Sequence, residues 1–394
     1  MKRQITKIIL FLAASSLTAV LAHAQTPATQ PTSPVDSAID RGLNYLKTTQ
    51  KPDGSWENAG DPPAITALAL KAFMGEKKYD ADQPFLEKGY DKLLSYQKED
   101  GGIYRDLLAN YNTAIAVSSL AASQEAEYKP QIAKAVSFLH HLQWTDQDNG
   151  APERQKVSAN DPRYGGFGYG KKQRPDGSNV QIALDALHDA GIPKDDPAYA
   201  AAIQFISRTQ NRSESNDQPW AGNDGGFIYS TADNGSSFAG EYTSPDGKRL
   251  LRSYGSMTYA GLKSMIYAGV AKDDPRVTAA FDWISKNWTL DINPGMQLAN
   301  PAQAQHGLYY YYNVFAQALN VMDQPIVTDV KGMKHDWRTE LVAKLASLQK
   351  PDGSWIGDKR WMEDDPILVT AYAVLALEQV KGDLASVGAR PASP

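Results

Sequence analysis

Apolar residues recur at helical spacing along most of this chain, and turn residues separate the helical segments. Segments 38–50 and 337–349 both carry apolar residues three and four positions apart, as on one face of an α-helix. Each pattern runs into the same seven residues, Gln-Lys-Pro-Asp-Gly-Ser-Trp, at 50–56 and again at 349–355. Proline and Asp-Gly favour a turn. A second apolar helical run follows each copy, so the unit is helix, turn, helix, and it repeats.

The unit can be followed through six copies. Gln50, Gln97 and Gln143 succeed one another at intervals of 47 and 46 residues, which fits two helices and two connections. Looser copies of the turn occur at 98–104, 165–170 and 224–229. The fourth and fifth units begin with Lys-Asp-Asp-Pro, a sequence typical of a helix start. The chain is therefore predicted to form twelve helices in one domain over residues 38–380.

The first and last copies are the most alike, and this similarity predicts how the array ends. A linear solenoid usually carries polar capping repeats at its two ends. Two nearly identical terminal repeats are instead expected to pack against each other and close a ring. We therefore predict an all-α fold, an (α/α)6 toroid, with the second helix of each pair on the inside. Small residues such as Thr66-Ala67, Thr113-Ala114 and Thr370-Ala371 suit tight packing there.

The two ends of the chain lack the repeat pattern. Lys2, Arg3 and Lys7 precede an apolar run over 8–21 and Ala-His-Ala at 22–24, the pattern of a cleaved signal peptide over residues 1–24. Residues 25–37, rich in Pro and Thr, are predicted as a flexible leader, and 381–394 as a flexible tail. No later stretch is long and apolar enough to span a bilayer. We expect an exported protein, either periplasmic or extracellular.

Composition excludes several classes of function. Removing the signal peptide lowers the formal net charge from −5 to −8, and a mildly acidic surface disfavours nucleic acid as a partner. The absence of cysteine excludes disulfides, thiolate metal sites and a cysteine nucleophile. No His-Glu-x-x-His, Gly-x-Ser-x-Gly or phosphate-loop motif occurs. The sequence predicts neither a metal nor a cofactor.

The turn itself carries a family resemblance. A glutamine at the end of a helix, a glycine-rich turn and then an aromatic residue resemble the QW repeat of the squalene cyclase and prenyltransferase family, over roughly residues 38–380. The resemblance implies a toroid with a central cavity. It also implies that the glutamine caps a neighbouring helix and that the tryptophan stacks between repeats. The residues given these structural roles are Gln50, Trp56, Gln349 and Trp355.

The sequence departs from the catalytic motifs of that family. Cyclases of the squalene-hopene type carry Asp-x-Asp-Asp, which protonates an alkene or epoxide, directly before Thr-Ala. The nearest stretch here is Met362–Pro366, where Met replaces the first Asp and Thr370-Ala371 follows later. Protein prenyltransferases bind zinc through Asp, Cys and His, and thioester-containing toroids need Cys. The resemblance therefore implies the architecture without that chemistry, and leaves open whether the protein is an enzyme.

Three clusters of polar and aromatic residues could form a site in the cavity. One is His306 with Tyr309–Tyr312; at most two of these tyrosines can face the cavity, because successive helical residues point about 100° apart. Another is segment 360–365, where paired carboxylates could raise one pKa and create a general acid. The third joins Arg252, Tyr254, Tyr259 and Lys263. The predicted catalytic residues are Glu363, Asp364 and His306, and the predicted cavity-binding residues are Tyr254, Tyr259, Tyr309, Tyr310 and Trp361.

Each cluster also has a purely structural interpretation. The tyrosines can fill the core, the acids of segment 360–365 can cap the helix that begins at Pro366, and Lys263 can form an ion pair. Glu363 is the exception among the acids, because the two Lys-Asp-Asp-Pro segments have no counterpart to it.

Three functions stay open at this point. A small apolar or terpenoid molecule would require a predominantly aromatic, dry cavity. A glycan would be bound by stacking on Trp361, Tyr309 and Tyr310, as in carbohydrate-active (polysaccharide lyase-like) toroids. A non-catalytic scaffold would hold an unknown protein partner through the long connections between residues 144 and 253, which are predicted to form a lid or rim.

Overall fold

The computed structural model describes residues 33–146, 156–170 and 173–381. The chain divides into a short unit, Met1–Ser33, and a large unit from Pro34 onward. The predicted signal peptide and the predicted tail beyond Lys381 lie outside the described residues, and only the large unit is considered below. Its first helix begins at Pro34, inside the segment predicted as a leader. None of the described helices combines the length and apolarity that a membrane crossing requires.

Within the described residues, six pairs of long helices follow one another along the chain. The first helices of the pairs are α1 (Pro34–Thr49), α3 (Pro84–Leu94), α5 (Lys129–Leu142), α7 (Pro197–Thr209), α9 (Pro275–Lys286) and α12 (Trp337–Leu348). Their partners are α2 (Ala64–Met74), α4 (Ala109–Ser123), α6 (Gly177–Asp189), α8 (Gly255–Tyr267), α11 (Leu308–Met322) and α13 (Pro366–Val380).

The connections contain the remaining elements. A short α10 (Met296–Ala299) and the 3₁₀ turns η1 (Ala126–Tyr128), η2 (Pro301–Gln303) and η3 (Arg360–Met362) lie between the long helices. Two antiparallel hairpins pair β1 (Glu241–Thr243) with β2 (Arg249–Leu251) and β3 (Ile326–Thr328) with β4 (Lys334–Asp336).

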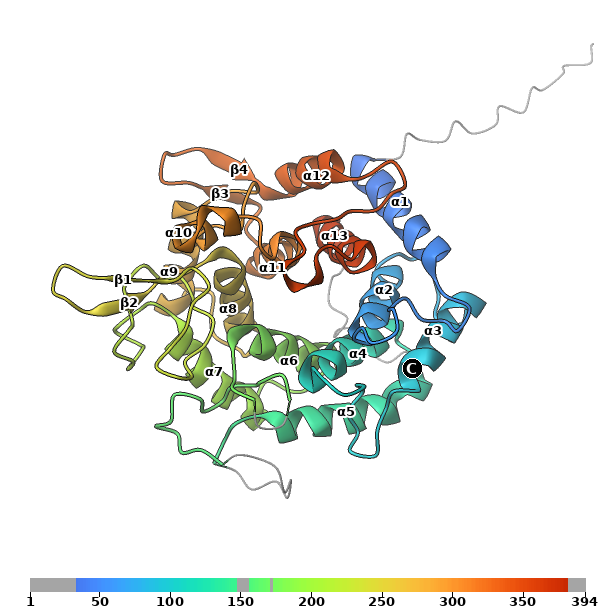
Figure 1. The fold of residues 1–394 in the computed structure, drawn as a ribbon, viewed down its shortest axis with the longest axis horizontal. Coiled ribbons are helices and arrows are strands. Elements are labelled where there is room, and N and C mark those ends of the chain that lie inside the picture. Colours follow the sequence, from blue (N-terminus) through green and yellow to red (C-terminus); the bar gives the residue numbers. More distant parts are fainter. Residues whose placement is uncertain (1–32, 147–155, 171–172, 382–394) are drawn as a thin grey trace, which may run out of the picture. The chain divides into compact units, whose positions relative to one another are not determined.

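The second helices of the pairs form a closed inner ring. Each packs against the next in the order α2, α4, α6, α8, α11, α13, and α13 packs against α2 (Figure 1). The first helices form an outer layer around them, and α1 contacts both α12 and α13 where the two ends of the array meet. The predicted all-α, (α/α)6 toroid is confirmed.

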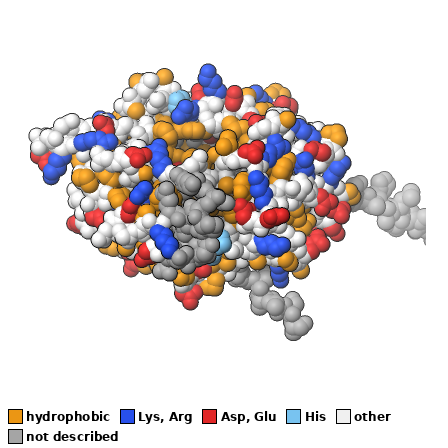
Figure 2. Space-filling model, turned by 60° about the horizontal axis from the view of Figure 1, so that its bottom comes forward, with side chains coloured by type: hydrophobic (Ala, Val, Ile, Leu, Met, Phe, Trp, Pro, Cys, Tyr) orange, Lys and Arg blue, Asp and Glu red, His pale blue; other side chains and the backbone are white. Residues whose placement is uncertain are grey.

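Apolar patterning explains which helix takes which layer. Outer helix α1 buries Ala38, Ile39, Leu43 and Leu46, which share one face, and leaves its other faces to solvent. Inner helix α13 buries every residue from Leu368 to Glu378, and a helix that is apolar all round must be covered on all sides. The outer surface is correspondingly polar: Figure 2 shows acidic and basic side chains interspersed over one face.

At the end of five of the six outer helices, all except α9, a glutamine ties one repeat to the next. The Gln50 amide donates to the carbonyl of Gly54 in its own turn (3.0 Å) and to that of Phe85 in the first turn of α3 (2.7 Å). Gln97, Gln143 and Gln210 repeat this arrangement toward α5, α7 and α9. Gln349 donates to Gly353 (2.9 Å) and to Ala38 (3.0 Å), which joins the last repeat to the first.

The tryptophans fill the same junctions. Trp56 and Trp355 are fully buried, and the Trp355 indole donates to the Leu345 carbonyl (2.8 Å). A Cβ added at Gly42 of α1 would lie 3.0 Å from the Trp355 ring, so only glycine leaves room for the indole at the closing junction. Gly89 of α3 gives the Trp56 ring the same room, at 3.1 Å.

We expect Gln349→Ala to lower the free energy of unfolding by about 1–3 kcal/mol, because it removes two hydrogen bonds to backbone carbonyls at the junction that closes the ring. Urea unfolding of the full chain measures the effect. Gln83→Ala is the matched control, since the exposed Gln83 amide donates only to Lys78, and it should change stability by less than about 0.5 kcal/mol. Equal stability of the two variants would show that the junction contributes nothing.

Candidate functional site

Aromatic side chains gather at the end of the ring where the inner helices have their N-termini. They come from these helices and from the connections that lead into them. Tyr111, near the start of α4, stacks on Tyr169 with ring centroids 5.9 Å apart. The hydroxyls of Tyr169 and Tyr229 lie 2.8 Å apart, and the Tyr229 ring contacts Phe238 at 4.6 Å.

Phe238 extends this series across the ring. Its ring centroid lies 6.3 Å from that of Tyr254, directly before α8, and 5.0 Å from that of Trp361, before α13. We call the six residues Tyr111, Tyr169, Tyr229, Phe238, Tyr254 and Trp361 the aromatic belt. Contacts between rings at these distances are favourable, and the belt joins elements from four repeats.

Tyr310 and Tyr372 lie beside the belt, on the inside of the ring. The Tyr310 hydroxyl donates to the Gln181 side-chain oxygen of α6 (2.9 Å), although α8 separates α11 from α6 in the ring. Its ring meets that of Tyr372 edge-on at 6.2 Å. Burial raises the pKa of Tyr111, and the nearby phenols of Tyr310, Tyr372 and Tyr169 raise it further.

Of the other predicted cavity residues, Tyr259 and Tyr309 lie elsewhere. Tyr259 packs against Tyr311 (5.5 Å) and Phe315 (5.0 Å), and Phe315 in turn contacts Trp337 of the outer layer. Tyr309 is buried beside Gly357 under the segment that precedes α13. The structure therefore brings Tyr254, Tyr310 and Trp361 to the belt, but not Tyr259 or Tyr309.

Glu363 is a buried carboxyl at the start of α11. Its Oε1 accepts hydrogen bonds from the backbone amides of Tyr309 (2.9 Å) and Tyr310 (2.8 Å), so it caps this helix from a distant part of the chain. Its Oε2 is buried beside Gly357 with no hydrogen-bond partner among the described residues. Burial raises the pKa of Glu363 to about 8, although the two amides act to lower it. The group therefore holds a proton at neutral pH.

The backbone that carries Glu363 is strained. Trp361 and Met362 have φ values of 57° and 65°, in the left-handed region that non-glycine residues seldom adopt. The Trp361 ring packs closely on Gly307, because a Cβ added to Gly307 would lie only 3.0 Å from the ring. Strain of this kind persists only where the surroundings fix it, and the Glu363 cap is one such restraint.

The other two predicted catalytic residues occupy different surroundings. The His306 ring meets Trp361 edge-on at 6.1 Å, and its Nε2 lies 3.7 Å from Asp358. Asp364 is exposed, while its neighbour Asp365 caps α13 through the amides of Ile367 and Leu368. The three predicted catalytic side chains therefore do not share one hydrogen-bond network, and their roles stay predictions.

A charged network lies deeper inside the ring, toward the ends of the inner helices. Lys263 of α8 pairs with Asp185 of α6 (2.7 Å) and donates to Gln317 of α11. Lys71 of α2 pairs with Asp189 of α6 (2.7 Å) across the position of α4. Sequence analysis singled out Lys263 but missed its partners. The available signal was the presence of charged residues in otherwise apolar helices.

Burial dominates the proton affinities of one of these pairs. It lowers the pKa of Lys263 and raises that of Asp185, although the charge of each residue opposes the change at the other. At Asp189 burial acts to raise the pKa, but Lys71 and His188 together outweigh it and hold the pKa of that carboxyl well below its usual range. Glu378 of α13 is almost fully buried, its Oε1 has no partner among the described residues, and burial raises its pKa strongly.

Comparison with known proteins places these features in a family context. The description of the family model that matches residues 59–227 is "Squalene-hopene cyclase C-terminal domain". The chain is 33% identical over 135 residues to lanosterol synthase erg7A of Aspergillus fumigatus, a match covering 29% of this chain and 17% of that protein. A probable squalene–hopene cyclase of Sinorhizobium fredii is 26% identical over 137 residues, covering 31% and 21% respectively. The matches thus span about a fifth of these relatives.

Solved structures show the same fold in two kinds of enzyme. The type II terpene cyclase MstE from Scytonema, in complex with merosterolic acid A, covers 89% of this chain and 98% of its own, with 14% identity and a TM-score of 0.51. The GH76A alpha-1,6-mannanase from Salegentibacter sp. HEL1_6 covers 88% and 98%, with 7% identity and a TM-score of 0.55. The sequence matches confirm the predicted resemblance to squalene cyclases, and the structural matches speak for the fold alone.

Glu363→Gln should remove a pH dependence of stability. The folded protein binds a proton at Glu363 up to about pH 8, whereas the carboxyl loses it near its ordinary pKa of 4.5 when unfolded. The wild-type protein therefore loses stability as pH rises between these values, by ~1.4 kcal/mol for each pH unit. The variant keeps an acceptor for both amides but has no carboxyl that titrates at this position. Its free energy of unfolding should therefore rise relative to that of the wild type between pH 5 and pH 8. Urea unfolding at both pH values, with exposed Glu99→Gln as control, checks this; a constant difference would contradict it.

Lys263→Met should cost about 3–5 kcal/mol of unfolding free energy, because it leaves the buried Asp185 carboxylate without its cation. Replacing both members, Lys263→Met with Asp185→Leu, should cost less than the single change, since no charge is then left unpaired. Urea unfolding of the two variants measures the difference. If the double variant is less stable than the single one, the cost of Lys263→Met does not come from leaving the Asp185 carboxylate unpaired.

Proposed function

We propose that this squalene cyclase-like toroid binds a small molecule with an apolar, isoprenoid-type chain inside its ring, against the aromatic belt. The observation that carries the proposal is the convergence of six aromatic side chains from four repeats at the end of the ring where the inner helices begin. Ligand sites are typically lined by aromatic side chains with a few placed polar groups, and Tyr310, Gln181 and Tyr169 supply polar groups here.

Partial exposure of side chains inside the ring supports access for a ligand. Trp361 is 41% exposed, and Tyr111 and Tyr310 are also accessible in part. A related fold offers a precedent for the ligand class: MstE was solved with geranylgeranyl dihydroxybenzoate, its substrate, and with merosterolic acid A. Because identity to MstE is only 14–15%, this precedent illustrates what the fold can hold and does not assign the ligand.

The charged network refines the proposed ligand. A purely apolar ligand requires a dry, aromatic cavity, and the belt meets that requirement only at one end of the ring. Toward the other end of the inner helices, the side chains of Lys71, Asp189 and Asp185 are partly exposed while Lys263 is buried, so a polar group could exchange hydrogen bonds with the first three. The ligand we propose is therefore amphipathic, with its apolar chain at the belt and its polar end toward the network.

The proposal is for binding and not for proton-initiated cyclisation. Both oxygens of Glu363 are enclosed: the two amides hold Oε1, and Oε2 is buried beside Gly357. Transfer of its proton to a ligand would require the segment before α13 to move. A catalytic role for Glu363, Asp364 or His306 is a further hypothesis, as is export of the protein. A glycan inside the ring has the precedent of the fold alone, since no contact described within the ring favours it.

The test is equilibrium binding of radiolabelled geranylgeraniol, delivered from cyclodextrin, to the full chain. We expect saturable binding of one molecule per chain. Phe238→Ala and Trp361→Ala should each weaken it at least tenfold by removing ring surface from the belt, and Tyr310→Phe should weaken it less, because only the hydroxyl is lost. Tyr242→Ala, on the outer β1–β2 hairpin, is the matched control.

Two results would overturn the proposal. One is the absence of saturable binding by a folded wild-type chain. The other is equal affinity of Trp361→Ala, Phe238→Ala and Tyr242→Ala, which would place the bound molecule away from the belt.

A further inference from the structure

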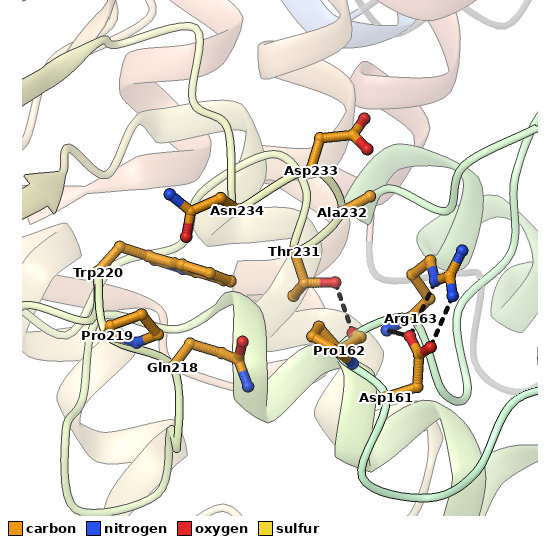
Figure 3. A pocket seen from close by; sticks show the side chains of 10 residues that line it. All are labelled: Asp161, Pro162, Arg163, Gln218, Pro219, Trp220, Thr231, Ala232, Asp233 and Asn234. Atoms are coloured by element: carbon orange, nitrogen blue, oxygen red, sulfur yellow. Dashed lines mark hydrogen bonds and ion pairs between the residues drawn. The ribbon is translucent and has the colours of Figure 1, made fainter.

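A pocket lies between connections of the third and fourth repeats, and its lining includes none of the belt residues. Its volume is about 370 Å³. Figure 3 shows three segments around it: residues 161–163 on one side, 218–220 on the other, and 231–234 between and above them. The first segment belongs to the connection from α5 to α6, and the other two belong to the connection from α7 to α8.

A single buried arginine fixes two walls of this pocket. The Arg208 guanidinium, at the end of α7, donates through Nη1 to the backbone carbonyls of Ala159 (3.0 Å) and Asp161 (2.9 Å). Its Nε and Nη2 bind the Asp217 carboxylate, directly before the opposite wall. Arg208 is only 9% exposed, so this connection is protected from solvent. The pocket is therefore preformed and does not need a ligand to assemble.

Further hydrogen bonds hold the remaining wall. Thr231 is buried, and its hydroxyl donates to the Pro162 carbonyl (2.6 Å), which ties segment 231–234 to the first wall. Asp233 and Asn234 follow with φ values of 54° and 61°. Two successive left-handed residues turn the chain sharply, and they place both polar side chains on the upper edge of the pocket (Figure 3).

The lining combines apolar surface with planar polar groups. Pro162, Pro219, Ala232 and the indole of Trp220 supply the apolar part. In Figure 3 the indole extends toward Thr231 between the side chains of Asn234 and Gln218. The Trp220 indole nitrogen is buried and has no hydrogen-bond partner among the described residues, which leaves a donor in the wall unused.

The charges of the lining exclude most ligand classes. Arg163 is paired with Asp161, since its Nε and Nη2 bind that carboxylate at 2.8 and 2.6 Å, and this pairing offsets the positive charge that an anionic ligand would need. Asp233 at the upper edge lies 3.9 Å from the Arg174 guanidinium, which offsets its charge, so the edge of the pocket carries no strong net charge. No group of acids and histidines within the described residues could hold a metal ion. The amides of Gln218 and Asn234 both donate and accept, which suits neutral hydroxyl groups.

We propose that this pocket binds a neutral sugar, with its hydroxyls at Gln218, Asn234 and Asp233 and its ring against the apolar lining. The volume lies near the lower end of the range of about 300–1,000 Å³ for small-molecule sites, which fits one or two sugar rings. The sugar site and the aromatic belt are formed by different residues, and neither proposal depends on the other.

The test is titration calorimetry of the full chain with maltose and cellobiose, together with galacturonate and inorganic phosphate as anionic probes. We expect one of the two disaccharides to bind with a millimolar or lower dissociation constant, and both anions to bind at least tenfold more weakly. Gln218→Ala and Asn234→Gly should each weaken sugar binding at least tenfold. Glycine suits the left-handed backbone at position 234, so the second variant removes the amide without strain.

Gln124→Gly is the matched control, because Gln124 also carries a side-chain amide on left-handed backbone, with φ of 61° at the end of α4. It should bind the disaccharide as the wild type does. The proposal is overturned if neither disaccharide binds to the folded chain, if galacturonate or phosphate binds more tightly, or if Gln218→Ala and Asn234→Gly retain wild-type affinity.

Discussion

The closure of the ring depends on one repeated interaction, the donation of a glutamine side chain to two backbone carbonyls at once. Each such glutamine binds its own turn and the first turn of the next outer helix, so it fixes both the shape of a repeat and its rotation against its neighbour. Gln349 makes this bond to Ala38, 311 positions away in the chain. Because this last junction joins the two ends of the array, the inner helices have a common interior instead of an open concave face.

A closed interior imposes a condition on every polar group placed within it, because burial without a partner costs free energy. The inner helices meet the condition in two ways. Near their beginnings, phenols bind one another and Gln181, and aromatic rings cover one another. Toward their ends, lysines pair with aspartates on other helices. At Glu363 and Glu378, burial raises the pKa of each carboxyl, which favours the neutral form over a buried charge. The interior is thus amphipathic, with an aromatic part and a charged part.

The long connections of the third and fourth repeats add a site that owes little to the ring. Arg208 holds these connections together as the glutamines hold the repeats, by donating to two backbone carbonyls at once. A toroid supplies a rigid base, and its connections can then vary without loss of the core. The terpene cyclase MstE and the GH76A alpha-1,6-mannanase share this fold, so the fold by itself does not fix a function.

The sequence by itself determined the repeat unit, the layer of each helix and the closure of the ring. These features follow from local signals: apolar spacing, turn residues and the recurrence of Gln-Lys-Pro-Asp-Gly-Ser-Trp. Tertiary structure alone decided which candidate residues meet. Tyr259 and Tyr310 look alike in the sequence, yet one packs outward and the other reaches Gln181. Lys71 and Asp189 pair across 118 positions. Such contacts depend on the rotation of each helix about its axis, and short-range patterns do not fix that rotation.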